Sequence, residues 1–339
     1  MWNNKIHIDG FRTGHVQGIA VDHNGDFYIS FTTVLVKADR YGTIIGSVKG
    51  LAGHLGCIAY RKEDGRVYGS LEYKHDIIGR NILAKMDQPI DIEDGFYIAI
   101  FDVDKITRMD MDAERDGIMK AVHLNEVLAD YQAPGHRFGC SGIDGVTFAP
   151  RPGEAGGRQD LYVAYGIYAD ETRQDNDHQI LLRYDVSQWE DYAQPINQRH
   201  MHRSGPDTPD GKYRVFTGNT TYGIQNLEYD RENNCLFAAV YRGTKPQYPN
   251  YSMFVIDLSQ DLETLPLAQI GLRHEATGIR GYHFPYGATG MIALGDGLFY
   301  FSRDFQNENG FGTDICLYRF TKESGFDLAS ELYPLGLSG

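Results

Sequence analysis

Basic residues are in the minority in this sequence. Lysine and arginine number 32 against 46 aspartates and glutamates in 339 residues, which gives a net charge of −14. A nucleic-acid-binding protein needs a cationic face for the phosphates, and an anionic membrane surface attracts the same kind of face. The charge balance therefore predicts that neither nucleic acid nor a membrane is a partner.

Long apolar runs and paired cysteines are missing as well. No run approaches the roughly 18 apolar residues of a membrane-spanning helix, and the first residues have no apolar signal region. No Cys-x-x-Cys spacing occurs, which argues against structural zinc. We expect buried free thiols, and from them a cytoplasmic protein, with secretion as the alternative if a signal was removed. The cysteines are Cys57, Cys140, Cys235 and Cys316.

A short pattern recurs five times along the chain. An alternating apolar strand is followed by a turn, commonly Asp-Gly or Asn-Gly, and then by a second apolar strand, as in Val16–Asp22, Asn24-Gly25 and Phe27–Ser30. Such a pattern is typical of a β-hairpin. The copies begin near residues 15, 54, 142, 223 and 287. A third apolar strand and a more irregular fourth strand follow each hairpin.

Four antiparallel strands in each of five repeats predict an all-β fold, a single β-propeller over residues 1–339. A sixth blade is the alternative and would lie between Ile77 and Gly95. We interpret that stretch as a long loop, because Pro89 and the acidic run that follows it interrupt a strand. Lys5–Ile8 is expected to pair with the last blade, and Ala121–Ala129 to form a short helix or turn.

The five hairpin copies resemble NHL-type and gluconolactonase-like propellers, and the runs Gly53–Tyr60 and Ser141–Pro150 look like an uncharacterised bacterial propeller family. The gluconolactonase resemblance implies a divalent, calcium-like metal on the axis, held by a Glu, an Asn and an Asp. Asp144 matches the Asp, and Asn226 or Gln225 matches the Asn. Gln17 stands where the Glu is required, so the sequence departs from the pattern there.

The loops that lead into the innermost strands carry histidines. In a propeller these loops share one face with the ends of the second strands, so residues far apart in sequence can meet there. Histidine suits proton transfer near neutral pH. We predict His15, His54 and His283 as acid/base groups, with Asp144 on the axis as a further catalytic group. The alternative for each histidine is a turn-capping role.

The ends of the second strands are rich in charged and aromatic residues. Lys74, Arg242 and Arg303 gather cations in an acidic protein, which favours an anionic ligand group. The remaining residues predicted to bind substrate are the carboxylates Glu72 and Asp304 and the tyrosines Tyr165 and Tyr222.

These residues predict an enzyme, a hydrolase or lyase, that acts on a small anionic, carbohydrate-like substrate at the mouth of the central channel. Two alternatives stand beside it: a non-catalytic propeller that binds a ligand or a protein, and a metal-dependent lactonase. The sequence leaves the oligomeric state open.

Overall fold

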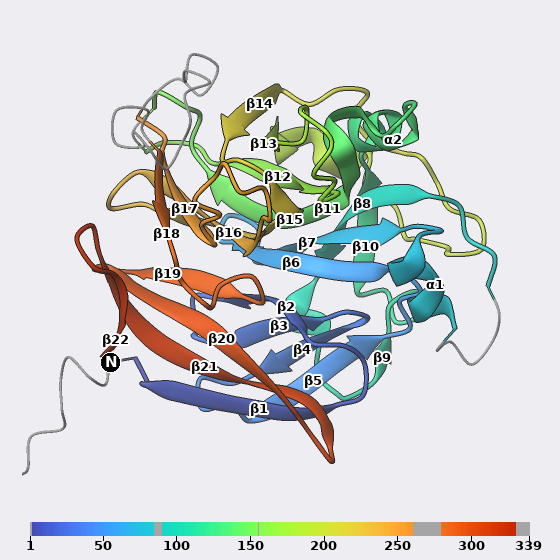
Figure 1. The fold of residues 1–339 in the computed structure, drawn as a ribbon. Helices are drawn as coiled ribbons and strands as arrows, with labels where there is room; N and C mark the ends of the chain where they lie inside the picture. The colour runs from blue at the N-terminus through green and yellow to red at the C-terminus, as the bar shows by residue number, and fades with distance from the viewer. Residues whose placement is uncertain (1, 85–89, 155, 260–278, 330–339) are drawn as a thin grey trace, which may run out of the picture.

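Five β-sheets form the molecule in this computed structural model (Figure 1). The structure describes residues 2–84, 90–154, 156–259 and 279–329. The innermost strands of the sheets contact one another in cyclic order and so close a ring. These strands are β2 (Val16–Val21), β6 (His54–Arg61), β11 (Cys140–Ala149), β15 (Thr220–Asp230) and β19 (Met291–Gly295).

Each sheet is one blade of a five-bladed propeller, as predicted. The first blade continues with β3 (Phe27–Phe31), β4 (Val34–Ala38) and β5 (Ile44–Lys49). The second continues with β7 (Arg66–Tyr73), β8 (Gly95–Phe101) and β10 (Met119–His123). The third continues with β12 (Asp160–Ile167), β13 (His178–Tyr184) and β14 (Gly211–Phe216). The fourth continues with β16 (Cys235–Arg242), β17 (Met253–Asp257) and β18 (Ile279–Tyr282). The fifth continues with β20 (Leu298–Asn307) and β21 (Gly310–Thr321).

The N-terminal strand closes the ring, as the sequence suggested. β1 (Lys5–Phe11) pairs antiparallel with β21, so the fifth blade is built from both ends of the described chain. β22 (Gly325–Leu328) pairs with another part of β21. The first blade gains an unexpected strand, β9 (Met111–Asp112), which comes from the second blade and runs parallel to β5.

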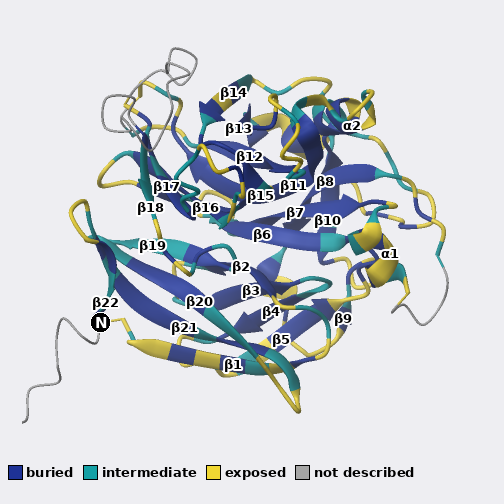
Figure 2. Ribbon diagram, viewed as in Figure 1, coloured by how far each residue is buried: buried dark blue, intermediate teal, exposed yellow. Residues whose placement is uncertain are grey.

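The core is divided among the blade interfaces. Five clusters of buried apolar side chains each lie between two neighbouring blades. Both faces of every sheet are therefore covered, and the strands read as nearly continuous apolar runs. Buried residues fill the strands in Figure 2, while exposed ones concentrate in the turns and along β1. All four cysteines are buried and free, as predicted.

Helix is scarce, and two predictions about it need correction. The stretch read as a loop contains α1 (Ile77–Leu83), which Asp76 caps by accepting a hydrogen bond from the amide of Gly79. Pro89 lies outside the described residues. The stretch Ala121–Ala129 begins inside β10, and α2 covers Asn125–Gln132. Short 3-10 turns cover Val103–Lys105, Arg137–Gly139 and Val186–Asp191. No helix of the described residues is long and apolar enough to cross a membrane.

Candidate functional site

A cavity of about 190 Å³ lies at the mouth of the channel where the innermost strands begin. We call it the axial cavity. Its walls come from the first four blades, and they bring together six of the residues predicted from the sequence. The residues lining it are His15, Gln17, Thr32, His54, Glu72, Lys74, Ile78, Ser141, Asp144, Tyr222, Gln225 and Tyr241.

An ion pair forms one wall of the axial cavity. Lys74 Nζ lies 2.5 Å from Glu72 Oε1 and 3.4 Å from Asp76 Oδ2, and it donates to the carbonyl oxygen of Ser141 at 2.8 Å. Both Glu72 and Lys74 are almost completely buried. Burial opposes the charged form of Lys74, yet Glu72 and Asp76 raise its pKa above the ordinary value. The charge of Lys74 is therefore already balanced inside the protein, which corrects the prediction that it is free to clamp an anion.

The carboxyl of Glu72 is held by the third blade as well. Its Oε2 accepts a hydrogen bond from the amide of Ile143 at 3.0 Å. Gly142 leaves space for this oxygen, because a β-carbon at that position would collide with it. Burial raises the pKa of Glu72, while Lys74 and the Ile143 amide oppose that shift. An ammonium at 2.5 Å and a backbone donor together favour the ionised form of Glu72 against this effect of burial.

His54 lies between two carboxyl groups. Its Nδ1 is 3.7 Å from Glu72 Oε1 and 3.8 Å from Asp144 Oδ1, and this buried nitrogen has no hydrogen-bond partner. Burial, with the charges of Lys74 and His15, lowers the pKa of His54 to about 3. The imidazole is therefore neutral at physiological pH.

Asp144 supplies the second carboxyl group. Its Oδ2 accepts a hydrogen bond from Gln225 Nε2 at 3.1 Å. Burial, followed by the negative charge of Glu72, raises the pKa of Asp144 well above its ordinary value. Since Lys74 is already paired with Glu72, Asp144 is the one of the two carboxyl groups that its surroundings favour more strongly in the protonated form.

His15 faces the same cavity from the first blade. Its Nε2 lies 3.2 Å from Gln17 Nε2 and 3.5 Å from Tyr241 Oη. An amide nitrogen is a donor, so this ring nitrogen accepts and the imidazole is neutral. Burial also lowers the pKa of His15, which favours the same neutral form. The site thus holds two neutral histidines, one ion pair and one carboxyl group whose protonated form is favoured.

A second cavity of about 470 Å³ adjoins the axial cavity, because Tyr241 lines both. It contains Arg242 and His283, and no carboxylate is among the described residues that line it. Arg303 borders it: the guanidinium carbon lies 4.7 Å from the ring centre of Tyr286, a lining residue. The predicted cations and histidines are therefore divided between two adjoining cavities, which corrects the expectation of one shared pocket.

Four predicted residues lie outside the lining of both cavities: Tyr165, Asp304, Arg303 and Asn226. Tyr165 is fully buried between the second and third blades, where its hydroxyl donates to Asp130 Oδ2 at 2.8 Å. Asp304 pairs across the strands with Thr313, and burial raises its pKa to about 7. Successive side chains of a strand point to opposite faces, so a polar residue near a strand end can face the core instead of the channel.

Asn226 does not complete a metal site. Its Nδ2 donates to the carbonyl oxygens of Gln17 at 2.8 Å and Ala288 at 3.0 Å, and its Oδ1 is buried without a partner. Among the described residues no three His, Cys, Asp or Glu side chains are grouped so that they could hold a metal. The position between the carboxylates of Glu72 and Asp76 is taken by the ammonium of Lys74. The donor set therefore does not fit the calcium-like metal that Asp144 and Asn226 suggested.

Sequence reasoning missed Tyr241 and Asp76. Tyr241 directly precedes Arg242 at the end of β16, and its position beside a predicted site residue was the available signal. Asp76 follows Lys74 by two residues, and this spacing was the available signal for a local ion pair.

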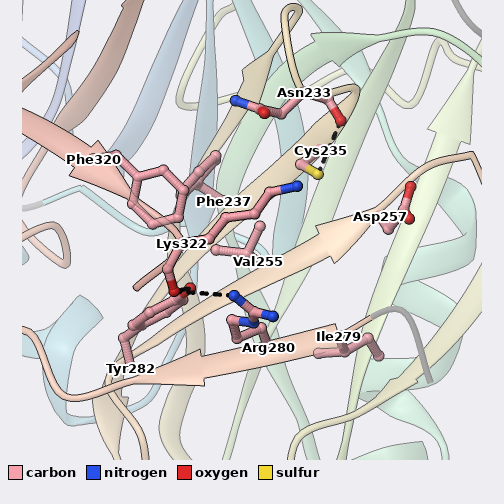
Figure 3. A pocket seen from close by; sticks show the side chains of 10 residues that line it. All are labelled: Asn233, Cys235, Phe237, Val255, Asp257, Ile279, Arg280, Tyr282, Phe320 and Lys322. Carbon is pink, nitrogen blue, oxygen red and sulfur yellow. Dashed lines mark hydrogen bonds between the residues drawn. The ribbon is translucent and has the colours of Figure 1, made fainter. Parts of the chain in front are cut away.

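A further cavity of about 240 Å³ lies between the fourth and fifth blades (Figure 3). Its floor includes Phe237 and Phe320, and the side chain of Lys322 extends across it. Burial raises the pKa of the Cys235 thiol to about 12, so this lining residue is not a ready nucleophile. None of the predicted site residues lines this cavity.

No protein-family model matches the chain, and no curated protein matches its sequence. Among solved structures, a GH43 β-1,3-galactosidase is 12% identical with a TM-score of 0.44, over 94% of this chain and 96% of the other. A gluconolactonase from Xanthomonas campestris is 11% identical with a TM-score of 0.38, over 89% and 72%. A protein of unknown function from Dyadobacter fermentans is 10% identical with a TM-score of 0.39, over 93% and 98%. At these identities and TM-scores, the activities of such proteins do not carry over to this chain.

Proposed function

We propose that the chain is an acid/base enzyme, a hydrolase or lyase, whose reaction takes place in the axial cavity. The observation that carries this proposal is the placement of His54 Nδ1. It is buried, lacks a hydrogen-bond partner, and lies within 4 Å of two carboxyl groups, of which Glu72 is paired with Lys74 and Asp144 is not. A pair of titratable groups with opposite roles in one cavity is the arrangement that general acid/base catalysis uses.

In the resting state, Asp144 is the acid and His54 is the base. Asp144 gives its proton to the oxygen that leaves the substrate, which takes the electron pair of the breaking bond. His54 Nδ1 removes a proton from the attacking water in a hydrolase, or from a substrate carbon in a lyase. The pair then stands as carboxylate and imidazolium, and their opposite charges at 3.8 Å stabilise this state. Return of the proton from His54 to Asp144 restores the resting site.

The Glu72–Lys74 ion pair influences the protonation of both Asp144 and His54. The negative charge of Glu72 holds the proton on Asp144, and it stabilises the imidazolium when His54 becomes charged. The carbonyl of Ser141 holds Lys74 and the amide of Ile143 holds Glu72, so both side chains keep their positions when substrate binds. Its role is to position charge and not to bind an anion.

The anionic group of the substrate is assigned to the second cavity. Arg242 and His283 line it, Arg303 borders it, and Tyr241 and Tyr286 contribute aromatic rings of the kind that contact sugars. A cavity with cationic side chains and no lining carboxylate suits a carboxylate, sulfate or phosphate group. A small sugar-like acid that reaches past Tyr241 would occupy both cavities.

A substrate panel with matched variants tests the proposal. Sugar lactones, glycosides and uronates are incubated with wild type and with Asp144→Asn, and products are followed by NMR. Wild type is expected to turn over at least one class, and Asp144→Asn to reduce kcat by about 10²–10⁴-fold, because the acid proton is lost. Glu63→Gln, on an exposed turn, is the control and is expected to keep full activity.

The outcomes separate the alternatives. A panel compound that raises Tm but is never converted would favour the non-catalytic, ligand-binding propeller. Full turnover by Asp144→Asn would overturn the acid/base assignment. With a substrate identified, Arg242→Ala is expected to raise KM by about ten- to hundred-fold and to leave kcat nearly unchanged, since it removes a charge-assisted contact outside the reacting groups.

A further inference from the structure

The opposite mouth of the channel contains its own cavity. Four of the innermost strands contribute to it through their later residues and β19 contributes Ile292, whereas the axial cavity is formed near the beginnings of the first four strands. Its volume is about 180 Å³. We call it the far cavity. It is lined by Ile19, Ala20, Val21, Ile58, Ala59, Tyr60, Thr147, Phe148, Gln159, Glu228, Tyr229, Arg231 and Ile292.

Glu228 is the one carboxylate among the described residues that line the far cavity. Its Oε1 accepts a hydrogen bond from the amide of Ala293 at 3.2 Å, and no basic side chain in the described part of the chain forms an ion pair with it. The nearby carboxylate of Asp230 adds negative charge and is itself bonded to the side chain of Asn233. A half-buried carboxylate with a single backbone donor is poorly compensated, so a cation would stabilise it.

Three aromatic residues, Tyr60, Phe148 and Tyr229, line the far cavity. The Tyr60 hydroxyl lies 2.9 Å from His23 Nδ1, and the Tyr229 hydroxyl donates to Asn234 Oδ1 at 2.9 Å, so both polar ends are engaged elsewhere. Phe148 completes the aromatic part of the lining. Aromatic side chains next to a carboxylate favour an organic ammonium group. A divalent metal would require more carboxylate or histidine ligands than the described residues bring together.

The basic residues nearby do not fill this role. Arg61 lies over the ring of Phe148, at 5.9 Å from its centre, but pairs with Asp64 at 2.8 Å. Arg231 is exposed at the edge of the far cavity. From this arrangement we infer that the far cavity binds a small primary ammonium ion, with Glu228 as its counter-ion and the aromatic rings around its alkyl part.

Protonation supports this assignment. Burial raises the pKa of Glu228 to about 8, so the empty site carries a neutral carboxyl near pH 7. An ammonium ion in the cavity would favour the ionised form, and binding near pH 7 should release a proton from Glu228. The other charged groups around the site are Asp230, Arg231, Arg61 and Asp64. Burial opposes the charge of Arg61, but its hydrogen bond to Asp64 raises its pKa.

Calorimetric titration with n-butylammonium chloride tests the inference. Wild type is expected to bind it saturably and to release protons, measured in two buffers of different ionisation enthalpy at pH 7. Butan-1-ol, which has the same chain without the charge, is expected not to bind. Glu228→Gln should weaken binding at least tenfold and remove the proton release, because the amide keeps the shape of the carboxyl but not its charge.

Two control variants make the result decisive. Arg231→Ala is expected to leave butylammonium binding unchanged or tighter, and Asp144→Asn is expected to leave it unchanged, which separates this site from the proposed catalytic one. Equal binding by wild type and Glu228→Gln would overturn the inference, as would the absence of saturation in wild type. Binding that appears only in Arg231→Ala would show that Arg231 is the counter-ion of Glu228, and would also overturn it. If Glu228→Gln does not fold, the proton release and the butan-1-ol comparison in wild type still decide.

Discussion

Glycine at position 142 determines whether the carboxyl of Glu72 can reach the axial cavity. The backbone there has φ +134°, and a β-carbon would meet Glu72 Oε2. The same oxygen accepts the Ile143 amide, so the second and third blades are joined at this point. The absence of a side chain at Gly142 therefore allows the Glu72–Lys74 ion pair to form where it affects the protonation of Asp144.

Gly142→Ala is predicted to disrupt the site and to lower stability. The alanine must displace Glu72, which breaks its contact with Ile143 and leaves Lys74 partly unpaired in a buried position. We expect a loss in the free energy of unfolding of about 3–5 kcal/mol, as for a broken buried ion pair. Urea denaturation measures it.

Gly117→Ala is the control for this prediction. Gly117 also has positive φ, at +64°, but a β-carbon there would meet nothing within 4 Å. Its cost should be the backbone strain alone, about 1–2 kcal/mol. Equal losses in the two variants would show that the collision with Glu72 is unimportant.

At the level of elements, the ring depends on β1. Its alternate residues Ile6 and Ile8 are buried in the cluster between the first and fifth blades, while Lys5 is exposed. Without β1, part of the edge of β21 would present unpaired backbone groups, and such edges pair with other chains. Closure by the N-terminal strand therefore protects the fold as well as completing it.

Ile8→Asp should open the ring. Loss of the buried apolar group costs about 2–5 kcal/mol, and the new carboxylate adds a desolvation penalty. We expect a marked fall in the urea midpoint and concentration-dependent association, measured by light scattering. Lys5→Ala, which removes only an exposed pair with Asp314, should cost no more than about 1 kcal/mol. A wild-type midpoint for Ile8→Asp would contradict the closing role of β1.

At the scale of the whole molecule, buried acids make stability depend on pH in an unusual direction. The folded pKa of Glu228 is about 8 and its ordinary value is 4.5. The folded state therefore binds more protons than the unfolded state between these values, and the free energy of unfolding falls as the pH rises through them. Asp144 acts in the same direction because burial and Glu72 raise its pKa.

Surface acids act in the opposite direction at lower pH. The hydrogen bond from Arg158 lowers the pKa of Asp185 from 3.8 to about 2, so its contribution is present above pH 4 and is lost as the pH falls toward 2. We expect maximal stability near pH 5 and a decline of several kcal/mol by pH 8.5. Urea denaturation across this range checks it, and Glu228→Gln should flatten the decline. A wild-type optimum near pH 8 would contradict the prediction.

The sequence by itself determined the propeller, its five blades and the closing strand. Turn residues and apolar alternation are local properties, so each hairpin can be recognised from its own sequence. For example, Asp296-Gly297, with positive φ at both residues, joins β19 to β20. Chain topology also sufficed to place His54, Glu72 and Asp144 at one mouth, because strand order fixes which loops share a face.

Only the tertiary structure determined which of those groups form ion pairs and which have shifted pKa values. Lys74 is paired with Glu72 and anchored by Ser141 from the next blade, and Tyr165 points into the core toward Asp130. Glu228 at the far mouth carries no local pattern that singles it out. Ion pairs and pKa shifts depend on burial and on distances of a few ångströms between residues from different blades. Those distances arise when the blades pack around the axis, and strand periodicity does not encode them.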